Sequence, residues 1–276
     1  MWCMLGQRGV EVYSWENFGH DWNIDAGEQL PLDNKILVKA DYGDIPDFSK
    51  SNPDNDIVFT WNGTTAGVRI KNTDWISDDR KGLTICDATS AVFSMEMDWP
   101  KLDVVTYSWQ KVLGSEAAHG MLILSPRAVE RLESYTPPWP VPKVFRLAQN
   151  QKLISGIFSG ATINTPSMIS VEDVLNSLNW SNEVGGISKL IEISENNLKI
   201  VSDWIETSEN FEFLAKDPET RSCTSICIIP KDEWFKSLSS DDQKKFMAEV
   251  CSQLETNEAG YAVSYTHLRA HETSTY

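Results

Sequence analysis

LTICDATSAVFSMEMDWPKLDVVTYSWQKVLG, residues 83–114, is the most informative segment of the chain for its fold. It contains two apolar, β-rich runs, Leu83–Asp87 and Asp103–Trp109, and buried parallel strands read as continuous hydrophobic runs of this kind. Asp87 stands at the C-terminal end of the first run, and Lys111 lies just beyond the end of the second. In open α/β sheets, ligands bind outside such strand ends. We therefore expect both side chains to meet in one crevice.

Four further runs of the same kind lie outside this stretch. Several are separated by helix-like or loop segments, and this rhythm favours an α/β fold with a largely parallel sheet. Residues 1–10 predict the end of a helix that runs directly into the first strand, so the chain is expected to begin in mid-fold. The four expected strands are Val10–Trp15, Lys35–Ala40, Asp56–Trp61 and Gly120–Ser125.

The second half of the chain predicts a smaller domain. Apolar residues from Ile187 to Ile205 recur largely at helical spacing, which indicates a long amphipathic helix. Residues 222–229 predict a strand, followed by a helix over about 240–254. We therefore expect a large domain over residues 1–170 and a small, incomplete α+β domain over residues 171–262.

The last stretch, VSYTHLRAHETSTY at residues 263–276, differs in character from the rest of the chain. It follows neither the helical nor the strand period clearly, which predicts a non-native tail. His267 and His271 have HxxxH spacing, but the Glu of the HExxH zinc motif is absent. A tag, frameshift or read-through sequence is therefore favoured over a metal site.

Composition excludes several classes of function. A hydrophobic content of 41% over 276 residues is enough for a sizeable core. The net charge of −16 argues against nucleic acid or an anionic membrane as a partner. No run is long enough to span a membrane and no signal peptide is visible, so we expect a cytoplasmic protein, with an organellar transit peptide as the open alternative. The five scattered cysteines, without CxxC spacing, predict reduced core thiols and no metal.

Asp87 and Lys111 together suit pyridoxal phosphate. This cofactor needs a lysine amine as its covalent partner and a carboxylate that keeps its pyridine nitrogen protonated. Lys111 follows the buried-looking strand VVTYSW, where desolvation should lower its pKa toward nucleophilic competence. Considered alone, Lys111 would be an ordinary surface lysine, because most lysines are exposed, and Asp87 would be a residue that merely ends a strand. The prediction therefore depends on the pair.

The same residues resemble a known family. DATS at 87–90, followed by SWQK at 108–111, is similar to the class V, fold-type I aminotransferases that use pyridoxal phosphate, and most similar to the phosphoserine aminotransferases. One such motif would be weak evidence, but five in the family's order are strong. The resemblance runs from Trp2 to about residue 262, and its four other motifs are WENFGHDWNI (15–24), TWNGTTAGVRI (60–70), EAAHGMLILSPRAVERLE (116–133) and INTPSMI (163–169).

The resemblance implies roles for three residues at the cofactor ring. Lys111 would be the catalytic lysine that binds the cofactor covalently, and Asp87 would be the partner of the ring nitrogen. Trp22 would stack on the ring, where an aromatic face adds dispersion energy. Without the family, Trp22 would be one packed amphipathic residue among 11 tryptophans.

Five further cofactor-binding residues are implied by the same motifs. Thr64 would hydrogen-bond near the cofactor phosphate or phenolic oxygen, and Thr89 and Gln110 would flank the pair, with Gln110 donating to the phosphate. Asn164 and Thr165 match the pair that reaches across a homodimer to the partner's cofactor phosphate. The ordinary alternatives are turn residues for the Asn-Gly-Thr segment and a loop-to-helix junction for Asn164-Thr165-Pro166. No metal is implied.

The reaction implied by the resemblance belongs to serine biosynthesis. An amino group is transferred between glutamate and 3-phosphohydroxypyruvate, giving 2-oxoglutarate and phosphoserine. The family's glycine-rich phosphate turn and its substrate-binding basic residues have no match here, so we expect this chain as written to be inactive. The arginines that remain without that role are Arg69, Arg80, Arg127, Arg131 and Arg146.

Three alternatives stay open at this point. The first is another class V aminotransferase. The second is a cysteine desulfurase-like enzyme on the same scaffold, which would need a mobile catalytic cysteine where this chain offers Cys223 and Cys227. The third is a non-catalytic chain that keeps the fold as a dimer-forming or binding subunit. Retention of both Asp87 and Lys111 argues against the third, whereas the expected truncation argues for it.

Overall fold

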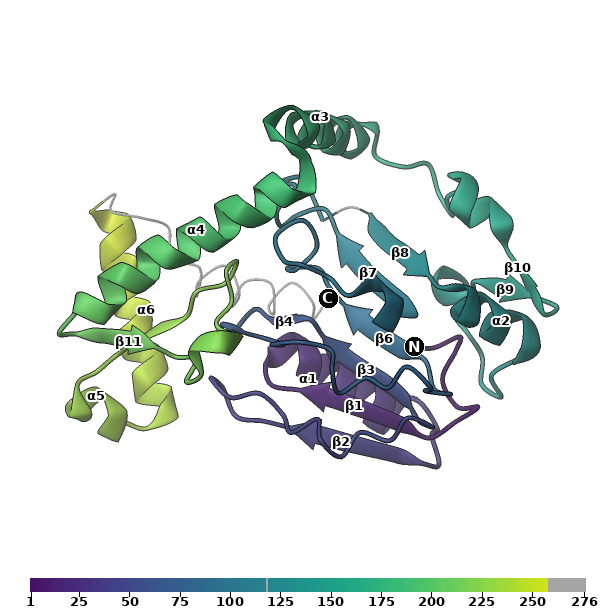
Figure 1. Ribbon diagram of the computed structural model, residues 1–276, viewed down its shortest axis with the longest axis horizontal. Helices are drawn as coiled ribbons and strands as arrows, with labels where there is room; N and C mark the ends of the chain where they lie inside the picture. Colours follow the sequence, from purple (N-terminus) through teal and green to yellow (C-terminus); the bar gives the residue numbers. More distant parts are fainter. Residues whose placement is uncertain (118, 258–276) are drawn as a thin grey trace. The chain divides into compact units, whose positions relative to one another are not determined.

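The computed structural model describes residues 1–117 and 119–257, so the predicted tail at 263–276 lies outside the described residues. A six-stranded sheet has the order β2-β1-β3-β6-β7-β8 (Figure 1). All its contacts are parallel except that of β8, which runs antiparallel to β7. All six strands predicted from the sequence are confirmed: β1 (Val10–Ser14), β2 (Lys35–Lys39), β3 (Asp56–Thr60), β6 (Thr84–Asp87), β7 (Val104–Ser108) and β8 (Gly120–Leu124).

Both faces of the central strands β1, β3 and β6 are buried, which is why these strands read as uninterrupted apolar runs, whereas the edge strands β2 and β8 are largely exposed or half-buried. Successive residues of a strand point to opposite faces. Tyr13 and Phe59 accordingly join one core cluster, whereas Val12 and Val58 join the other. A stack of Phe48 on Trp75, with ring centroids 4.3 Å apart, packs against the first cluster.

Two helices on the Val12 side position the strand ends. Helix α1 (Asn17–Ile24) begins three residues after the end of β1, and the Glu16 side chain caps it. Helix α2 (Pro126–Ser134) follows β8, with Ser125 as its cap and Pro126 in its first turn. Ala128 and Leu132 of α2 join the same core cluster as Val12.

Shorter elements connect and follow the sheet. They are the π-helix η1 (Asp25–Gln29), β4 (Asn62–Gly63), β5 (Val68–Arg69), η2 (Trp99–Lys101), η3 (Lys143–Phe145), β9 (Ala148–Gln149), β10 (Lys152–Leu153), η4 (Ser155–Ser159), α3 (Met168–Val184), α4 (Gly186–Thr207), β11 (Phe211–Phe213), η5 (Pro218–Thr220), β12 (Ile228–Pro230), α5 (Glu233–Ser237) and α6 (Ser240–Thr256). The long helix and the last helix predicted from the sequence are confirmed as α4 and α6. None of the helices in the described part of the chain is long and apolar enough to cross a membrane.

Two predicted elements differ in the structure. Residues 1–5 form a single turn rather than a helix end, with the N–H groups of Met4 and Leu5 donating to Met1 O at 3.0 and 3.1 Å. The predicted strand over residues 222–229 is a strand only at Ile228–Pro230, where it pairs with β11. The preceding residues form hydrogen bonds elsewhere, for example Ser222 N to Gly67 O at 2.9 Å.

Contacts divide the described chain into two units. Among the described residues, the first contains residues 1–202 and 214–227, and with them the whole six-stranded sheet; the second contains residues 203–213 and 228–257. Within the second unit, β11 pairs with β12, and Phe235 of α5 packs on Phe246 of α6 with ring centroids 5.6 Å apart. The domain boundary near residue 170 stays a prediction.

Candidate active site

Strands β1, β3, β6 and β7 are parallel, so their C-terminal ends meet at one edge of the sheet, which we call the carboxyl edge. Glu16 follows β1, and Thr64 lies in the short β4–β5 hairpin that follows β3. Asp87 is the last residue of β6, and Lys111 lies three residues beyond the end of β7. The structure therefore brings together four polar side chains that are far apart in sequence.

Asp87 is held in place by the residue two positions further on. Its Oδ1 accepts hydrogen bonds from the Thr89 N–H at 3.0 Å and from the Thr89 hydroxyl at 2.6 Å. Burial raises the pKa of the Asp87 carboxyl, and the Thr89 hydrogen bonds and the charge of Lys111 partly offset this rise. The predicted neighbours Asp87 and Thr89 thus form one local unit.

Lys111 is half-buried at the same edge. Burial lowers the pKa of its ammonium, and the negative charges of Asp87 and Glu16 oppose that change. A lysine whose pKa is lowered carries more neutral amine near neutral pH, which is the nucleophilic form. A turn fixes the backbone here, because the Gly114 N–H donates to Lys111 O at 2.9 Å.

Thr64 belongs to a buried network of hydroxyl and amide groups. Its Oγ1 lies 2.8 Å from Ser90 Oγ, which also accepts from Asn62 Nδ2 at 2.9 Å. The Thr224 hydroxyl donates to Ser90 O at 2.8 Å. Among the described residues, Asn62 Oδ1 has no hydrogen-bond partner although it is buried.

Four predicted site residues lie outside this cluster. Trp22 packs against the Val12-side core, five residues past the start of α1 and so about 7 Å along the helix axis. Gln110 is exposed beside Lys111. Asn164 and Thr165 are exposed in the loop before α3. The roles of all four remain predictions.

Glu16 and Ser90 are site residues that the sequence analysis missed. Glu16 is fully buried, accepts a hydrogen bond from the Gly19 N–H at 2.7 Å, and interacts with the charge of Lys111. An acidic residue directly after a strand and before a helix was readable as a helix cap. Its proximity to Lys111 depends on strand order, which local sequence does not report.

The five arginines that the resemblance left without a role have partners in other parts of the framework. Arg131 pairs with Asp56, the first residue of β3, at 2.7 Å, while Arg80 and Arg127 pair with Asp103, just before β7, at 3.2 and 3.0 Å. These three therefore lie at the opposite, amino ends of the strands. Two others have different partners: Arg69 pairs with Glu195 at 2.5 Å, and Arg146 donates to Val141 O at 3.0 Å.

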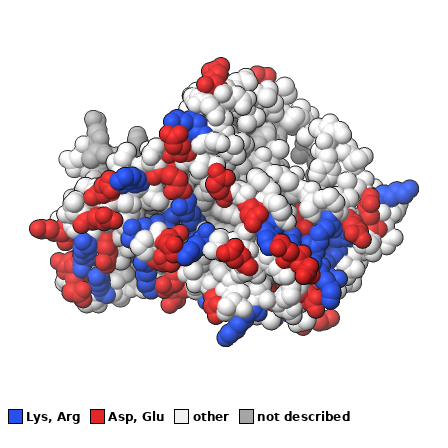
Figure 2. Space-filling model, viewed as in Figure 1, with Lys and Arg blue, Asp and Glu red and all other residues white. Residues whose placement is uncertain are grey.

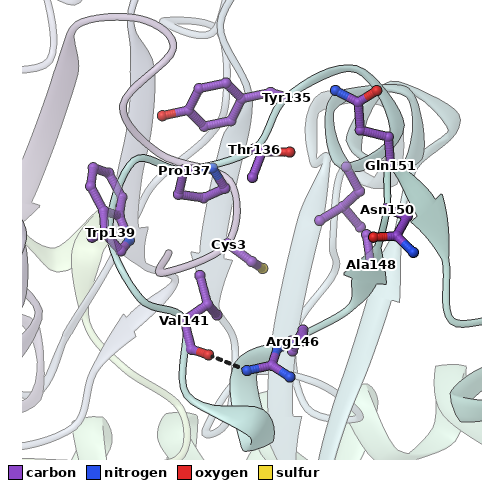
Figure 3. A pocket seen from close by; sticks show the side chains of 11 residues that line it. Cys3, Tyr135, Thr136, Pro137, Trp139, Val141, Arg146, Ala148, Asn150 and Gln151 are labelled. Atoms are coloured by element: carbon purple, nitrogen blue, oxygen red, sulfur yellow. Dashed lines mark hydrogen bonds between the residues drawn. The ribbon is translucent and has the colours of Figure 1, made fainter.

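A cavity of about 210 Å³ lies away from the carboxyl edge. Cys3, Tyr135, Trp139 and Arg146 are among its lining residues, and neither Asp87 nor Lys111 is (Figure 3).

On the face drawn in Figure 2, Lys and Arg side chains are interspersed with Asp and Glu. In residues 1–117 and 119–257, no group of three or more His, Cys, Asp or Glu side chains is arranged to hold a metal ion.

The carboxyl edge fits pyridoxal phosphate chemically. Burial shifts the pKa of Asp87 upward and that of Lys111 downward, so both groups are pushed toward their neutral forms. A protonated ring nitrogen beside Asp87 would supply the positive charge that favours its carboxylate. The hydroxyls of Thr64 and Ser90 and the unpartnered Asn62 oxygen add polar groups suited to a substituted ring.

The thiols do not support the desulfurase alternative. Burial raises the pKa of both Cys223 and Cys227 to about 11, whereas a nucleophilic cysteine needs a lowered pKa. The Cys227 thiol donates to Thr64 O and Thr65 O at 3.7 Å. It is therefore packed on the hairpin rather than carried by an open loop.

Comparisons with known proteins identify the family. No protein-family model matches the chain. The phosphoserine aminotransferases of Methanosarcina barkeri and Methanosarcina mazei are each 49% identical over 263 residues, which cover 95% of this chain and 68% of theirs. A relative in Parabacteroides distasonis with the same name is 26% identical over 229 residues, covering 81% of this chain and 59% of its own.

Solved structures agree on the fold. The phosphoserine aminotransferase of Bacillus circulans superposes with a TM-score of 0.68 at 18% identity, covering 91% of this chain and 65% of its own. The enzyme of Trichomonas vaginalis, solved with pyridoxal phosphate bound, superposes with a TM-score of 0.67 at 17% identity, covering 91% of this chain and 67% of its own. The fold is thus that of the fold-type I aminotransferases, and the chain belongs to the phosphoserine aminotransferase family.

Proposed function

We propose that the carboxyl edge of this chain is the cofactor site of a phosphoserine aminotransferase, with Lys111 as the lysine that binds pyridoxal phosphate covalently. The observation that carries the proposal is that Lys111 and Asp87 follow adjacent parallel strands at the same edge of the sheet. Burial there raises the pKa of Asp87 and lowers the pKa of Lys111, which favours the neutral form of each group. The substrates would be glutamate and 3-phosphohydroxypyruvate, or phosphoserine and 2-oxoglutarate in reverse. The chain spans 68% of the length of its Methanosarcina relatives.

The residues divide the chemistry between them. Pyridoxal phosphate, when bound, supplies a protonated pyridine ring that accepts the electrons released when a proton leaves the amino acid's Cα. Asp87 holds the proton on the ring nitrogen, and Thr89 keeps its carboxylate oriented through two hydrogen bonds. Lys111, once freed from the cofactor, takes the Cα proton because its lowered pKa leaves a neutral amine. Thr64 orients the bound group through its hydroxyl.

We also propose that the active form is a homodimer in which Asn164 and Thr165 reach the partner's cofactor phosphate. Apolar side chains around these two residues support the proposal, because an exposed apolar cluster marks an interaction site. Ile163 is 51% exposed, Met168 61% and Ile169 73%.

A cytoplasmic location would suit the free thiols of Cys3, Cys86, Cys223 and Cys227.

Asp87→Asn tests the proposed function. The M. barkeri relative would supply the parts of a chimera that lie outside the matched region, and phosphoserine with 2-oxoglutarate would be the assay. An amide cannot hold the ring proton, so we expect kcat to fall about 100-fold or more while cofactor binding persists. Thr136→Ala, at a residue lining the cavity away from this edge, is the control and should leave kcat unchanged. Turnover near wild type in the Asp87→Asn variant would contradict the assignment.

A further inference from the structure

Glu16 is a fully buried carboxylate that touches two of the segments forming the carboxyl edge. Its Oε1 accepts from the Gly19 N–H at 2.7 Å, in the first turn of α1. Its Oε2 accepts from the Thr65 N–H at 3.3 Å and from the Thr65 hydroxyl at 3.0 Å. One side chain therefore ties the start of α1 to the β4–β5 hairpin.

The hairpin packs closely on Glu16 and on its neighbour Trp15. A Cβ atom on Gly63 would lie 2.8 Å from Glu16 Cγ and 2.3 Å from Trp15 Nε1, so a side chain at this position would displace both. Trp15 Nε1 also donates to Val68 O at 2.9 Å, at the far end of the hairpin. Thr64 lies between these contacts, so the position of its hydroxyl depends on them.

Glu16 also contributes charge at the edge. Its carboxylate opposes the lowering of the Lys111 pKa that burial causes, as Asp87 does from β6. Burial raises the pKa of Glu16 itself, while its hydrogen bonds favour the ionised form. The other titratable groups that sense its charge are Tyr42, whose pKa burial raises, and Cys227, whose pKa burial raises to about 11. Both stay neutral near pH 7.

We propose that Glu16 is a positioning residue of the aminotransferase site: it holds the hairpin that presents Thr64, and it adds negative charge to the carboxyl edge where Lys111 lies. The proposal rests on the proposed function and gives a role to Glu16, a residue of the WENFGHDWNI motif to which the resemblance assigned none. Glu16 is fully buried and hydrogen-bonded to protein groups, so it acts through Thr64 and Lys111.

Three variants of the full chain separate the two roles. Glu16→Gln keeps the volume, removes the charge and turns one acceptor toward Thr65 into a donor. Thr65→Val removes the hydroxyl bond to Glu16 but keeps the charge. Glu11→Gln is the matched control, since Glu11 is a buried glutamate of β1, the strand that precedes Glu16, and it accepts hydrogen bonds from Tyr13, Asn52 and Asn55 at 2.7, 3.1 and 2.8 Å.

Two measurements are made on each variant. The first is the Kd for pyridoxal phosphate, measured by absorbance titration. The second is the Lys111 midpoint, which is the pH at which Lys111 of the cofactor-free chain reacts with an amine reagent at half its maximal rate, measured by peptide mass spectrometry. We expect Glu16→Gln to weaken cofactor binding roughly tenfold or more and to move the Lys111 midpoint to lower pH. Thr65→Val should weaken binding and leave the midpoint unchanged. Glu11→Gln should change neither.

The measurements distinguish a failure of the Glu16 proposal from a failure of the proposed function. A Glu16→Gln chain that matches Glu11→Gln in both measurements overturns the proposal. If Glu16→Gln does not fold, Thr65→Val decides: unchanged cofactor affinity in that variant overturns the hairpin role. A wild-type chain that binds no pyridoxal phosphate contradicts the proposed function instead, and the Lys111 midpoint still tests the charge role of Glu16.

Discussion

At the scale of single residues, the two cysteines near the hairpin should behave as inert core thiols. Because burial raises the pKa of Cys223 and Cys227 to about 11, little thiolate is present at pH 8. We expect both to react with iodoacetamide roughly 100-fold more slowly in the folded chain than in urea, as measured by peptide mass spectrometry. Folded-state labelling of either thiol at the unfolded rate would reopen the desulfurase alternative.

The site residues that could be predicted from the sequence are those whose position follows from the pattern of strands. Asp87 and Lys111 lie at the ends of strands that the hydrophobic runs predict, and parallel pairing brings their strands together. Glu16 was missed because a buried charge looks like a surface charge in sequence. The family motif implies a cofactor role for Trp22, whereas in the structure its side chain packs against the core cluster that contains Val12. Local sequence does not report which part of the fold a helical side chain contacts.

At the scale of elements, the buried ion pair between α2 and β3 should be a major contributor to stability. Arg131 contacts Asp56 through both Nη atoms, at 2.7 and 3.0 Å, and donates to Met4 O at 2.9 Å. Arg131→Ala would leave a buried carboxylate without its cation, so we expect the free energy of unfolding to fall by about 3–5 kcal/mol.

Urea unfolding of Arg131→Ala beside Arg146→Ala checks this expectation. Arg146 is exposed and donates to one backbone carbonyl, so its loss should change the free energy of unfolding by about 0.5 kcal/mol or less. Equal effects of the two substitutions would contradict a structural role for Arg131.

The elements themselves were largely predictable because each was marked by a local apolar pattern. The six strands follow from short apolar, β-rich runs, and helix α4 follows from apolar residues at helical spacing. The strand expected at residues 222–229 was shortened by tertiary contacts instead. Ser222 and Thr224 bond to Gly67 and Ser90, more than a hundred residues earlier, and nothing in the local sequence announces those partners.

At the scale of the whole molecule, the proposed homodimer predicts a sensitive surface around Asn164 and Thr165. Ile169→Lys places a charge on a side chain that is 73% exposed beside them, and burying that charge in an interface would be costly. We expect sedimentation to show a dimer for the wild type and a monomer for this variant. Ile200→Lys, at a residue 68% exposed on α4, is the control and should stay dimeric. A dimer that survives Ile169→Lys would contradict this interface.

The most direct test of the account asks which lysine binds the cofactor. The chain is incubated with pyridoxal phosphate, borohydride makes the lysine–cofactor bond permanent, and peptide mass spectrometry locates the added mass. We predict stoichiometric modification of Lys111 and its loss in Lys111→Ala, because Lys111 lies at the carboxyl edge with a lowered pKa beside Asp87. Stoichiometric modification of any other lysine in the wild-type chain, with Lys111 unmodified, would contradict the account.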